Sequence, residues 1–397
     1  MAEQRTGTQR LIAEQVAGAS LSAIKEMAMR AARVPDVASL SWGLPSFPTP
    51  EHIRRAVADA LSHDPDIGKY TLPDGLPALR ELVRETHAGK TGARVSASDN
   101  VFVTAGNMQG MSSVLQALIE PGDEIVLTDP GFASHIQQVL LRGGTPVHWP
   151  LDEAAGWRLD LDALDKLVTS RTKALVLVNP SNPTGSLFTR DELDALGRLV
   201  VERNLLLILD DPYSELVFER PERFYNPASN PALAEHLVYL FTFSKIHAMS
   251  GWRLGYMILP GWLRSDILKV HDANLICAPR LAQVAGMAAL SGDQHHVGEF
   301  RRILGQRREL ICERLDALPH VFDYARPDGA YYVFPRIVAD HRDSWSFALR
   351  LLEEARVAVT PGVAFGPASD HHVRMAFCVS DDEINRAFDR LQVLFPE

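Results

Sequence analysis

The sequence predicts an α/β fold, in which a large domain with a mostly parallel, mixed sheet covered by helices is joined to a smaller α+β domain. From about residue 100, short apolar runs alternate with longer amphipathic stretches, as is typical of βαβ units. After about residue 295 this alternation stops, and a long charged helical pattern precedes short strand-like segments. At 397 residues, the chain is long enough to form both units.

Six apolar runs predict the strands of the large domain, in the order VFVTA, EIVLTDP, KALVLVNP, LLLILDD, LVYLFTFS and RLGYMIL. In the small domain, the helical pattern from residue 297 is followed by GAYYVFP, VAVTPG and HVRMAFC. Residues 1–47 fall outside the alternating region, so we expect them to pack with the small domain. The large domain then spans residues 48–295, and the small domain spans residues 296–397.

Composition excludes several classes of protein. Hydrophobic residues make up 46% and charged residues 23% of the chain, as in ordinary globular proteins. The net charge of −10 argues against a protein whose main role is to bind nucleic acid. No apolar run approaches the ~18 residues of a membrane span. Three widely spaced cysteines provide neither a disulfide framework nor a CxxC metal pair, so we expect a cytoplasmic protein without a metal site.

The loops that follow the predicted strands carry the residues of interest, because ligands bind at the carboxyl ends of parallel strands. After VFVT comes AGNMQGM, a turn that leads directly into a helix and contains Gly106, Asn107 and Met108. Such a turn presents backbone N–H groups to an anion such as phosphate. The glycine can equally serve a steric purpose, so this signal alone is weak.

The next two strand ends carry polar side chains. In NPSNPTG, the amide of Asn182 can donate to a ligand oxygen, although two Asn-Pro pairs also make a rigid turn by themselves. In DDPYSEL, Asp210 directly ends an apolar strand, where a carboxylate requires a positive partner. Tyr213 follows three residues later, and Asp211 fits the cap of a following helix.

The last of these strand ends, SKIHAMSGWRLG, contains Lys245 and Arg253. Lysine is scarce in this chain, with seven lysines against 33 arginines, although a solvated lysine is the ordinary interpretation of any single one. Together the strand ends offer groups for a phosphate, a positive ring nitrogen, an oxyanion and a carbonyl. Pyridoxal 5′-phosphate has these four complements.

NPSNPTG, DDPY and SKIHAMSGWRLG, in this order and spacing, resemble a fold-type I pyridoxal-phosphate enzyme of the class I/II, aspartate-aminotransferase-like family, and the likeness spans nearly the whole chain. The resemblance implies that Lys245 forms the internal aldimine and then moves the substrate proton. It implies that Asp210 keeps the ring nitrogen protonated. Asn182 and Tyr213 match the pair that donates to the ring phenolate.

The resemblance also implies further cofactor contacts. Phe132, in DPGFASH, matches the aromatic residue stacked on the ring, with a core phenylalanine as the alternative. His135 matches a histidine behind the aspartate in some members, but also fits a surface helix. Met108 departs from the polar residue often found in the phosphate turn, so only its backbone N–H would serve. The implied phosphate ligands are Gly106, Asn107, Met108, Ser244 and Arg253.

Substrate binding and assembly follow from the same resemblance. Arg374, in HVRMAFC, matches the arginine that holds the substrate α-carboxylate, which suits its planar fork. Tyr70 matches a tyrosine that reaches the phosphate of a neighbouring subunit, which implies a homodimer with shared sites. Gly43 lies where the N-terminal segment of the family passes over the substrate, and Trp42 can line the pocket.

The predicted function is amino-group transfer from an L-amino acid to a 2-oxo acid by a ping-pong mechanism. A β-lyase, a decarboxylase or a cyclising enzyme could use the same site, because the same electron sink serves each reaction. A ligand sensor fused to a DNA-binding module is disfavoured by the negative charge, and a nicotinamide enzyme by the lack of GxGxxG after a strand. Trp42 and Phe132 favour a neutral or broad range of amino acids, while the roles of Arg280 and His271 stay open.

Overall fold

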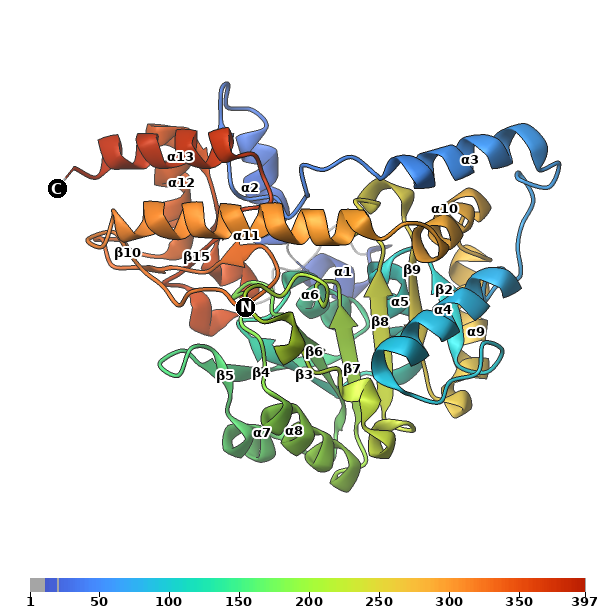
Figure 1. The fold of residues 1–397 in the computed structure, drawn as a ribbon. Helices are drawn as coiled ribbons and strands as arrows, with labels where there is room; N and C mark the ends of the chain where they lie inside the picture. The colour runs from blue at the N-terminus through green and yellow to red at the C-terminus, as the bar shows by residue number, and fades with distance from the viewer. Residues whose placement is uncertain (1–10, 20, 397) are drawn as a thin grey trace.

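The computed structural model describes residues 11–19 and 21–396. An eight-stranded sheet forms the centre of its larger part, in the order β2-β9-β8-β7-β6-β3-β4-β5 (Figure 1). Within this sheet β9 and β5 run antiparallel to their neighbours, and the other pairs are parallel. The strands are β2 (Val101–Thr104), β3 (Glu124–Asp129), β4 (Thr145–Asp152), β5 (Arg158–Leu159), β6 (Thr172–Val178), β7 (Leu206–Asp211), β8 (Leu237–Thr242) and β9 (Gly255–Ile258). The predicted mixed, mostly parallel sheet is therefore confirmed.

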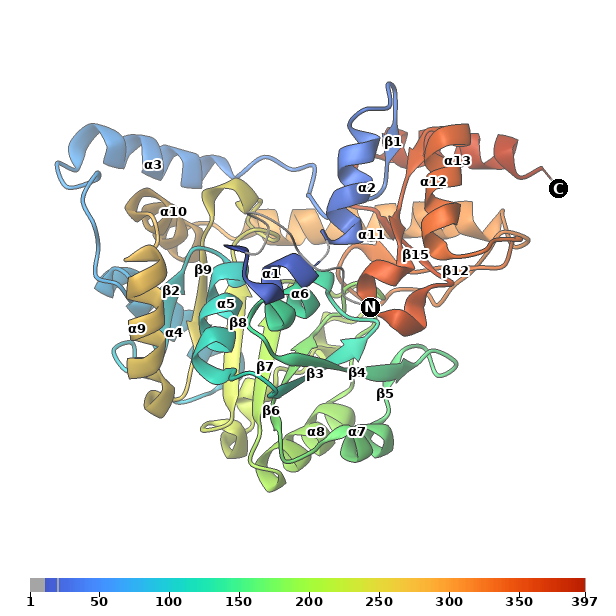
Figure 2. The ribbon, with the colours of Figure 1, turned by 180° about the vertical axis from the view of Figure 1, so that it is seen from behind.

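Helices cover both faces of this sheet, as the two opposite views show (Figures 1 and 2). Because side chains alternate along a strand, neighbouring residues of β7 enter different cores. Leu207 and Leu209 belong to the larger hydrophobic cluster, whereas Ile208 belongs to a second cluster under α5 and α9. The helices of this part are α3 (Glu51–His63), α4 (Pro77–Thr91), α5 (Asn107–Leu118), α6 (Ala133–Leu141), α7 (Leu161–Leu167), α8 (Arg190–Glu202), α9 (Arg264–Leu275) and α10 (Arg280–Ser291).

Burial explains which strands the sequence reveals. Every residue of β2, β3, β7, β8 and β9 is buried, so these strands are nearly continuous apolar runs. By contrast, only two of the eight residues of β4 are buried, and the strand contains two prolines, so it was not among the predicted strands. Its short antiparallel partner β5 was also missed, because two residues carry no periodic signal.

The smaller part contains three small sheets: β11-β15-β14, β10-β12 and β1-β13. β1 (Ala38–Ser39) pairs in parallel with β13 (Val357–Ala358), so the N-terminal segment contacts the C-terminal region directly. The remaining strands are β10 (Phe322–Asp323), β11 (Tyr332–Val333), β12 (Arg336–Ile337), β14 (Thr360–Pro361) and β15 (Val373–Ala376). The helices near the two termini are α1 (Glu14–Gly18), α2 (Ala23–Ala31), α11 (His295–Asp316), α12 (Ser344–Ala355) and α13 (Asp381–Leu394).

Helix α11 connects the two parts of the molecule, running from beside α10 to the region of α13 (Figure 1). The predicted division between residues 295 and 296 falls at its first turn, and it stays a prediction. Side-chain caps fix several helix starts, including the reciprocal capping box of Thr189 and Glu192 at α8. Across residues 11–19 and 21–396, no helix has the length and apolar character needed to cross a membrane.

Candidate active site

A pocket opens at the carboxyl ends of the parallel strands, where the sheet meets the smaller part of the molecule. Strands β6, β7 and β8 end here side by side, and the turn after β2 adds the start of α5. The pocket is lined by Asn107, Met108, Phe132, Val178, Asn182, Asp210, Pro212, Tyr213, Thr242, Ser244, Lys245, Ser250, Arg253 and Tyr332. Side chains predicted from separate strand ends therefore meet around one cavity.

One end of the pocket suits an anion. Helix α5 begins at Asn107, directly after Gly106, whose φ of 81° favours glycine. A Cβ on Gly106 would lie 2.5 Å from a guanidinium nitrogen of Arg253, so the missing side chain lets that cation approach the turn. The helix N-terminus and the cation both attract negative charge. Hydroxyl groups line the pocket with them, from Thr242, Ser244 and Ser250.

Asp210 is held by two neighbours. Nδ2 of Asn107 donates to Oδ1 of Asp210 at 2.6 Å, and Nε2 of His135 lies 3.1 Å from Oδ2. His135 is buried, so of the two interpretations of this histidine the structure selects the position behind the aspartate. The carboxylate of Asp210 thus has a fixed orientation at the pocket wall.

The suggestion that Asp211 caps a helix is wrong. Asp211 is the last residue of β7 and is completely buried. Its carboxylate accepts hydrogen bonds from the hydroxyl of Tyr239 at 2.6 Å and from the backbone N–H of Ser214 at 2.8 Å. Burial raises the pKa of Asp211 to about 6. The residue therefore stabilises the turn beneath the site.

Lys245 follows β8 and is partly buried. Its Nζ donates to the backbone carbonyl of Gly43 at 2.9 Å and lies 5.9 Å from the ring centroid of Tyr331. Burial lowers the pKa of Lys245 to about 8, and the positive charges of Arg374 and Arg253 add to this effect. A lysine amine in this environment is far more often neutral near pH 8 than a solvated lysine amine.

Arg374 is buried on β15 and faces the pocket residues from the smaller part. One Nη donates to Oδ1 of Asn182 at 3.1 Å, and the other donates to the carbonyl of Ser41 at 2.7 Å. The guanidinium carbon lies 4.3 Å from the ring centroid of Tyr332. The Nε of Arg374 has no hydrogen-bond partner among the described residues. A buried cation with uncharged partners and a spare donor suits a carboxylate.

Aromatic residues form the other walls. The hydroxyls of Tyr213 and Tyr332 lie 3.1 Å apart, and burial raises the pKa of Tyr213 well above its ordinary value. Phe132 stands edge to face against His135, with ring centroids 5.2 Å apart. Hence Phe132 lies next to the Asp210–His135 pair and also faces the cavity.

Two predicted site residues, Tyr70 and Trp42, lie away from the lining, as do His271 and Arg280, whose roles the sequence left open. Tyr70 is 75% exposed and Trp42 is 49% exposed, with the Lys25 amine 4.9 Å from the Trp42 ring. His271 is buried between α5 and Phe102, where Nδ1 lies 3.1 Å from the amide nitrogen of Gln109. Arg280 pairs with Asp64 at 3.2 Å. The remaining predicted residues line the pocket or touch its lining.

The sequence matches a known family over most of its length. A sequence profile described as aminotransferase class I and II matches residues 35–391. The chain belongs to this family. The aspartate aminotransferase of Pyrococcus abyssi is 34% identical over 95% of this chain and 96% of its own. The aromatic-amino-acid aminotransferase 2 of Thermococcus litoralis is 32% identical over 95% of this chain and 96% of its own.

Solved structures of aminotransferases share the fold. The aspartate aminotransferase from Thermus thermophilus with maleate has a TM-score of 0.90 at 32% identity, covering 97% of this chain and 99% of its own. The aromatic aminotransferase from Pyrococcus horikoshii has a TM-score of 0.86 at 34% identity, covering 93% of this chain and 98% of its own. The predicted fold-type I architecture and the class of enzyme, an aminotransferase, are confirmed.

Sequence reasoning missed several residues of this aminotransferase site. Tyr332 was treated only as part of a strand, although it lines the pocket and contacts Tyr213 and Arg374. The doublet of tyrosines in GAYYVFP is a weak signal, because aromatic residues are common in strands. The other pocket residues that were missed are Val178, Pro212, Thr242 and Ser250.

Proposed function

We propose that this aminotransferase binds pyridoxal 5′-phosphate in the pocket and transfers an amino group from an L-amino acid to a 2-oxo acid in two alternating half-reactions. One observation carries the proposal: Lys245, whose pKa is lowered, lines one pocket with Asp210 and Arg253, and Arg374 lies against the same lining. Among the described residues, both guanidinium groups donate to uncharged oxygens. These charges complement a cofactor that has a phosphate and a ring nitrogen, and a substrate that has a carboxylate.

The residues present fit the cofactor. When bound, it supplies an aldehyde that captures amines and a ring that accepts the electron pair released at the substrate Cα. Arg253 and the N-terminus of α5 would bind the phosphate, with Ser244 as a hydroxyl donor. The carboxylate of Asp210, oriented by Asn107 and His135, holds a proton on the ring nitrogen.

Other side chains orient the ring. Phe132, Tyr213 and Asn182 line the pocket, where Phe132 would pack against the ring and Tyr213 and Asn182 would donate to its oxygen. Lys245 is the base that removes the proton from the substrate Cα. It then donates this proton to another atom of the bound cofactor and substrate. Its lowered pKa suits this role, because a neutral amine is available near pH 8. These roles are assigned because the residues occupy the positions of this sequence that match the family motifs.

Arg374 binds the α-carboxylate of the substrate. Its guanidinium carbon lies 4.3 Å from the ring centroid of Tyr332 and 5.0 Å from that of Phe365, and both contacts restrict its movement. A bidentate carboxylate would take over donors that now reach Ser41 and Asn182, and Nε is already free. Gly43, whose carbonyl accepts from Lys245, closes the site from the N-terminal segment.

We propose a neutral or broad range of amino acids as donors. Among the described residues that line the pocket, the cations are Lys245 and Arg253, and both already have roles. Met108, Phe132 and Tyr332 offer apolar surface to a side chain. Trp42 directly precedes Gly43, and we propose that its side chain completes the wall when substrate is bound. A strong preference for aspartate over all neutral donors would contradict this part of the proposal.

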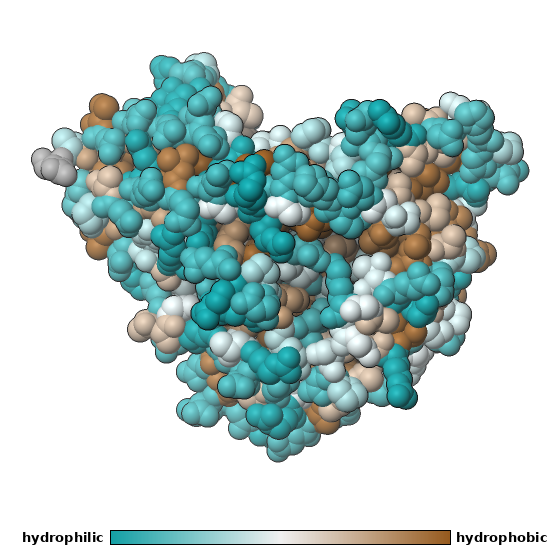
Figure 3. Space-filling model, viewed as in Figure 1, coloured by the Kyte–Doolittle hydropathy of each residue, from teal (hydrophilic) through white to brown (hydrophobic). Residues whose placement is uncertain are grey.

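A homodimer with shared sites is also proposed. Tyr70 and Leu72 are 75% and 53% exposed on the loop between α3 and α4, which runs along the edge of the molecule in both views (Figures 1 and 2). Gln283 of α10 holds this loop, since its Nε2 donates to the hydroxyl of Thr71 at 3.0 Å. Hydrophobic residues gather on the same side of the molecule, between α3 and α4 (Figure 3). A second copy would cover these residues and receive Tyr70 in its site.

The cytoplasm is the proposed location of this enzyme. The three cysteines, Cys277, Cys312 and Cys378, are unpaired and buried, as suits a reducing compartment.

The test is a product analysis. The full chain is loaded with pyridoxal 5′-phosphate and incubated with single L-amino acids and 2-oxoglutarate as the acceptor. Transamination yields glutamate and the matching 2-oxo acid in equal amounts, without ammonia or carbon dioxide. Release of ammonia, carbon dioxide or a cyclic product without glutamate would instead support the alternative, a lyase, decarboxylase or cyclising enzyme at the same site.

A further inference from the structure

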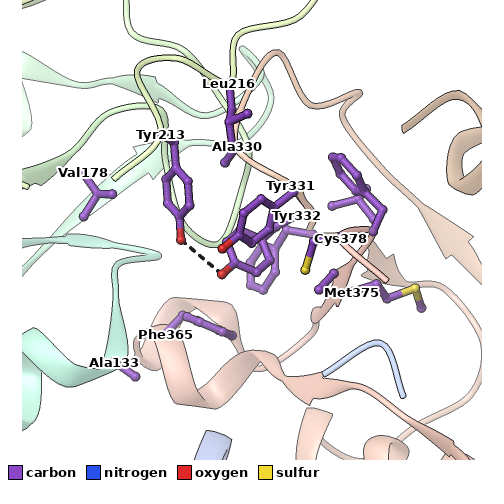
Figure 4. Close-up of a cluster of buried hydrophobic side chains, with 14 of the residues drawn as sticks. Ala133, Val178, Tyr213, Leu216, Ala330, Tyr331, Tyr332, Phe365, Met375 and Cys378 are labelled. Atoms are coloured by element: carbon purple, nitrogen blue, oxygen red, sulfur yellow. Dashed lines mark hydrogen bonds between the residues drawn. The ribbon is translucent and has the colours of Figure 1, made fainter. Parts of the chain in front are cut away.

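Tyr332 lies between two groups that the proposed function assigns to different parts of the reaction. Its hydroxyl is 3.1 Å from the hydroxyl of Tyr213, and the two point toward each other in the close-up view (Figure 4). The guanidinium carbon of Arg374 lies 4.3 Å from the centroid of its ring. Tyr332 therefore contacts both the tyrosine proposed for the cofactor ring oxygen and the arginine proposed for the substrate carboxylate.

The fold fixes Tyr332 in this position. In the antiparallel pair of β11 and β15, Tyr332 lies opposite Ala376, so the side chain of Arg374 is its diagonal neighbour on the same face. The residue is 2% exposed, and its ring packs against the ring of Tyr331 with centroids 4.8 Å apart. A Cβ on Gly43 would lie 1.9 Å from its hydroxyl oxygen, so the N-terminal segment closes tightly over it. The hydroxyl cannot turn away without disturbing these contacts.

Either hydroxyl of this pair can donate to the other. Burial raises the pKa of both tyrosines, and the positive charge of Arg374 opposes this rise at each of them. A ring oxygen that accepts from Tyr213 would leave Tyr332 as the donor within the pair. When the Tyr332 O–H donates to the oxygen of Tyr213, the proton of Tyr213 is free to donate into the pocket. Hydrogen bonds in such a chain strengthen one another.

We propose that Tyr332 is a positioning residue that couples the substrate-binding arginine to the tyrosine that donates to the cofactor ring oxygen. The inference rests on the proposed function and adds a connection between Arg374 and Tyr213, to which that function gives separate roles. When a carboxylate neutralises Arg374, Tyr332 becomes a weaker donor, and Tyr213 in turn donates less strongly to the ring oxygen. More negative charge then stays on that oxygen, which makes the bound cofactor more basic. Binding of substrate thereby changes the cofactor before any bond is broken.

The test is the pH midpoint of the visible absorption change of the cofactor-loaded full chain. Tyr332→Phe should raise this midpoint by about 0.5 to 1 pH unit, as expected for the weakening of one buried hydrogen bond. Tyr213→Phe should raise it further, and the double variant should match Tyr213→Phe alone, because the relay acts only through Tyr213. Additive shifts in this double-mutant cycle would overturn the proposal.

Tyr225→Phe is the matched control, since this buried tyrosine is not part of the pocket lining and its hydroxyl donates to Oδ1 of Asp194 at 2.7 Å. It should shift the midpoint by less than half as much as Tyr332→Phe, and an equal shift would overturn the proposal. With saturating 3-phenylpropionate as the carboxylate probe, the wild-type midpoint should rise, and this rise should shrink in Tyr332→Phe. Equal responses, or none in the wild type, would also overturn the coupling. A wild-type chain without any visible cofactor band would refute the proposed function itself.

Discussion

Lys245 shows how one side chain acquires a chemical role from its surroundings. The amine bonds to a main-chain carbonyl, that of Gly43, at 2.9 Å, and Arg374 and Arg253 disfavour its charge. Burial contributes most to the lowered pKa. Of these neighbours, only Arg253 is close to Lys245 in the sequence. The chemistry of this lysine therefore depends on the assembled pocket.

The reactivity of Lys245 should follow its lowered pKa. Only the neutral amine captures an aldehyde, so the rate at which the cofactor-free chain captures pyridoxal 5′-phosphate should rise with pH and level off above a midpoint near pH 8. Below that midpoint the rate should fall about tenfold for each pH unit. Stopped-flow absorbance in the visible region measures this rate. A midpoint near the ordinary lysine value of 10.5 would show that burial does not act on this amine.

The strand-end residues could be predicted because the topology of the sheet brings them together. Asp210, Asn182 and Lys245 each follow an apolar run, and parallel strands end at the same edge. Tyr332 could not be found in this way, because it comes from the smaller part, 119 positions after Tyr213 in the sequence, and contacts Tyr213 only once the two parts pack. Asp211 was misassigned because its partner Tyr239 lies on the neighbouring strand, and no local signal in the sequence indicates that pairing.

The segment of residues 41–43 connects the two parts of the site through hydrogen bonds to its backbone carbonyls. The carbonyl of Ser41 accepts from Arg374, that of Trp42 from the thiol of Cys378 at 3.6 Å, and that of Gly43 from Lys245. Three consecutive carbonyls thus accept hydrogen bonds from three side chains. Arg374 belongs to β15, Cys378 follows that strand, and Lys245 lies in the loop after β8. The segment fixes both the proposed base and the proposed substrate arginine.

Adding a methyl group to this segment should impair catalysis. Gly43→Ala places a Cβ 1.9 Å from the Tyr332 hydroxyl oxygen, so the segment or the buried ring must move. We expect kcat/KM to fall at least about tenfold and the free energy of unfolding to drop by about 1–3 kcal/mol. Steady-state kinetics and urea unfolding measure the two effects.

Gly298→Ala in α11 is the matched control, because nothing lies within 4 Å of the added atom. It should leave kcat/KM unchanged and stabilise the helix slightly. Equal kinetics for Gly43→Ala and wild type would show that the segment is not held as closely as its contacts indicate.

The apolar strands at the centre of the sheet were easier to predict than its edge. Buried parallel strands need apolar residues on both faces, so their sequences stand out. β4 is half exposed, and its polar residues conceal the strand. The contact of the N-terminal segment with the C-terminal region was expected only because the segment falls outside the alternating pattern, whereas the pairing of β1 with β13 is a long-range contact that no local signal specifies.

For the whole molecule, the proposed sharing of sites can be tested by mixing inactive variants. Lys245→Ala removes the base from its own site, and Tyr70→Ala removes the tyrosine offered to a neighbour. In a mixed dimer, one site has Lys245 from one chain and Tyr70 from the other, and is intact. Co-refolded mixtures should therefore regain up to about a quarter of wild-type activity, by random pairing and one intact site in each mixed dimer.

As the control, the two variants are refolded separately and then combined without exchange of subunits. The activity of this mixture should equal the sum of the activities of the two variants. If co-refolding gives no more activity than this sum, Tyr70 does not act in the site of a neighbouring chain. Sedimentation of the wild-type chain as a monomer would contradict the homodimer as well.

The most direct test of the central claim is a single half-reaction. The cofactor-loaded chain is mixed with one neutral L-amino acid and no oxo acid, while the visible spectrum and the products are followed. We expect the visible band to disappear once, with one 2-oxo acid released per site and no further turnover until an oxo acid is added. Continuous release of ammonia or carbon dioxide with the band intact would contradict transamination.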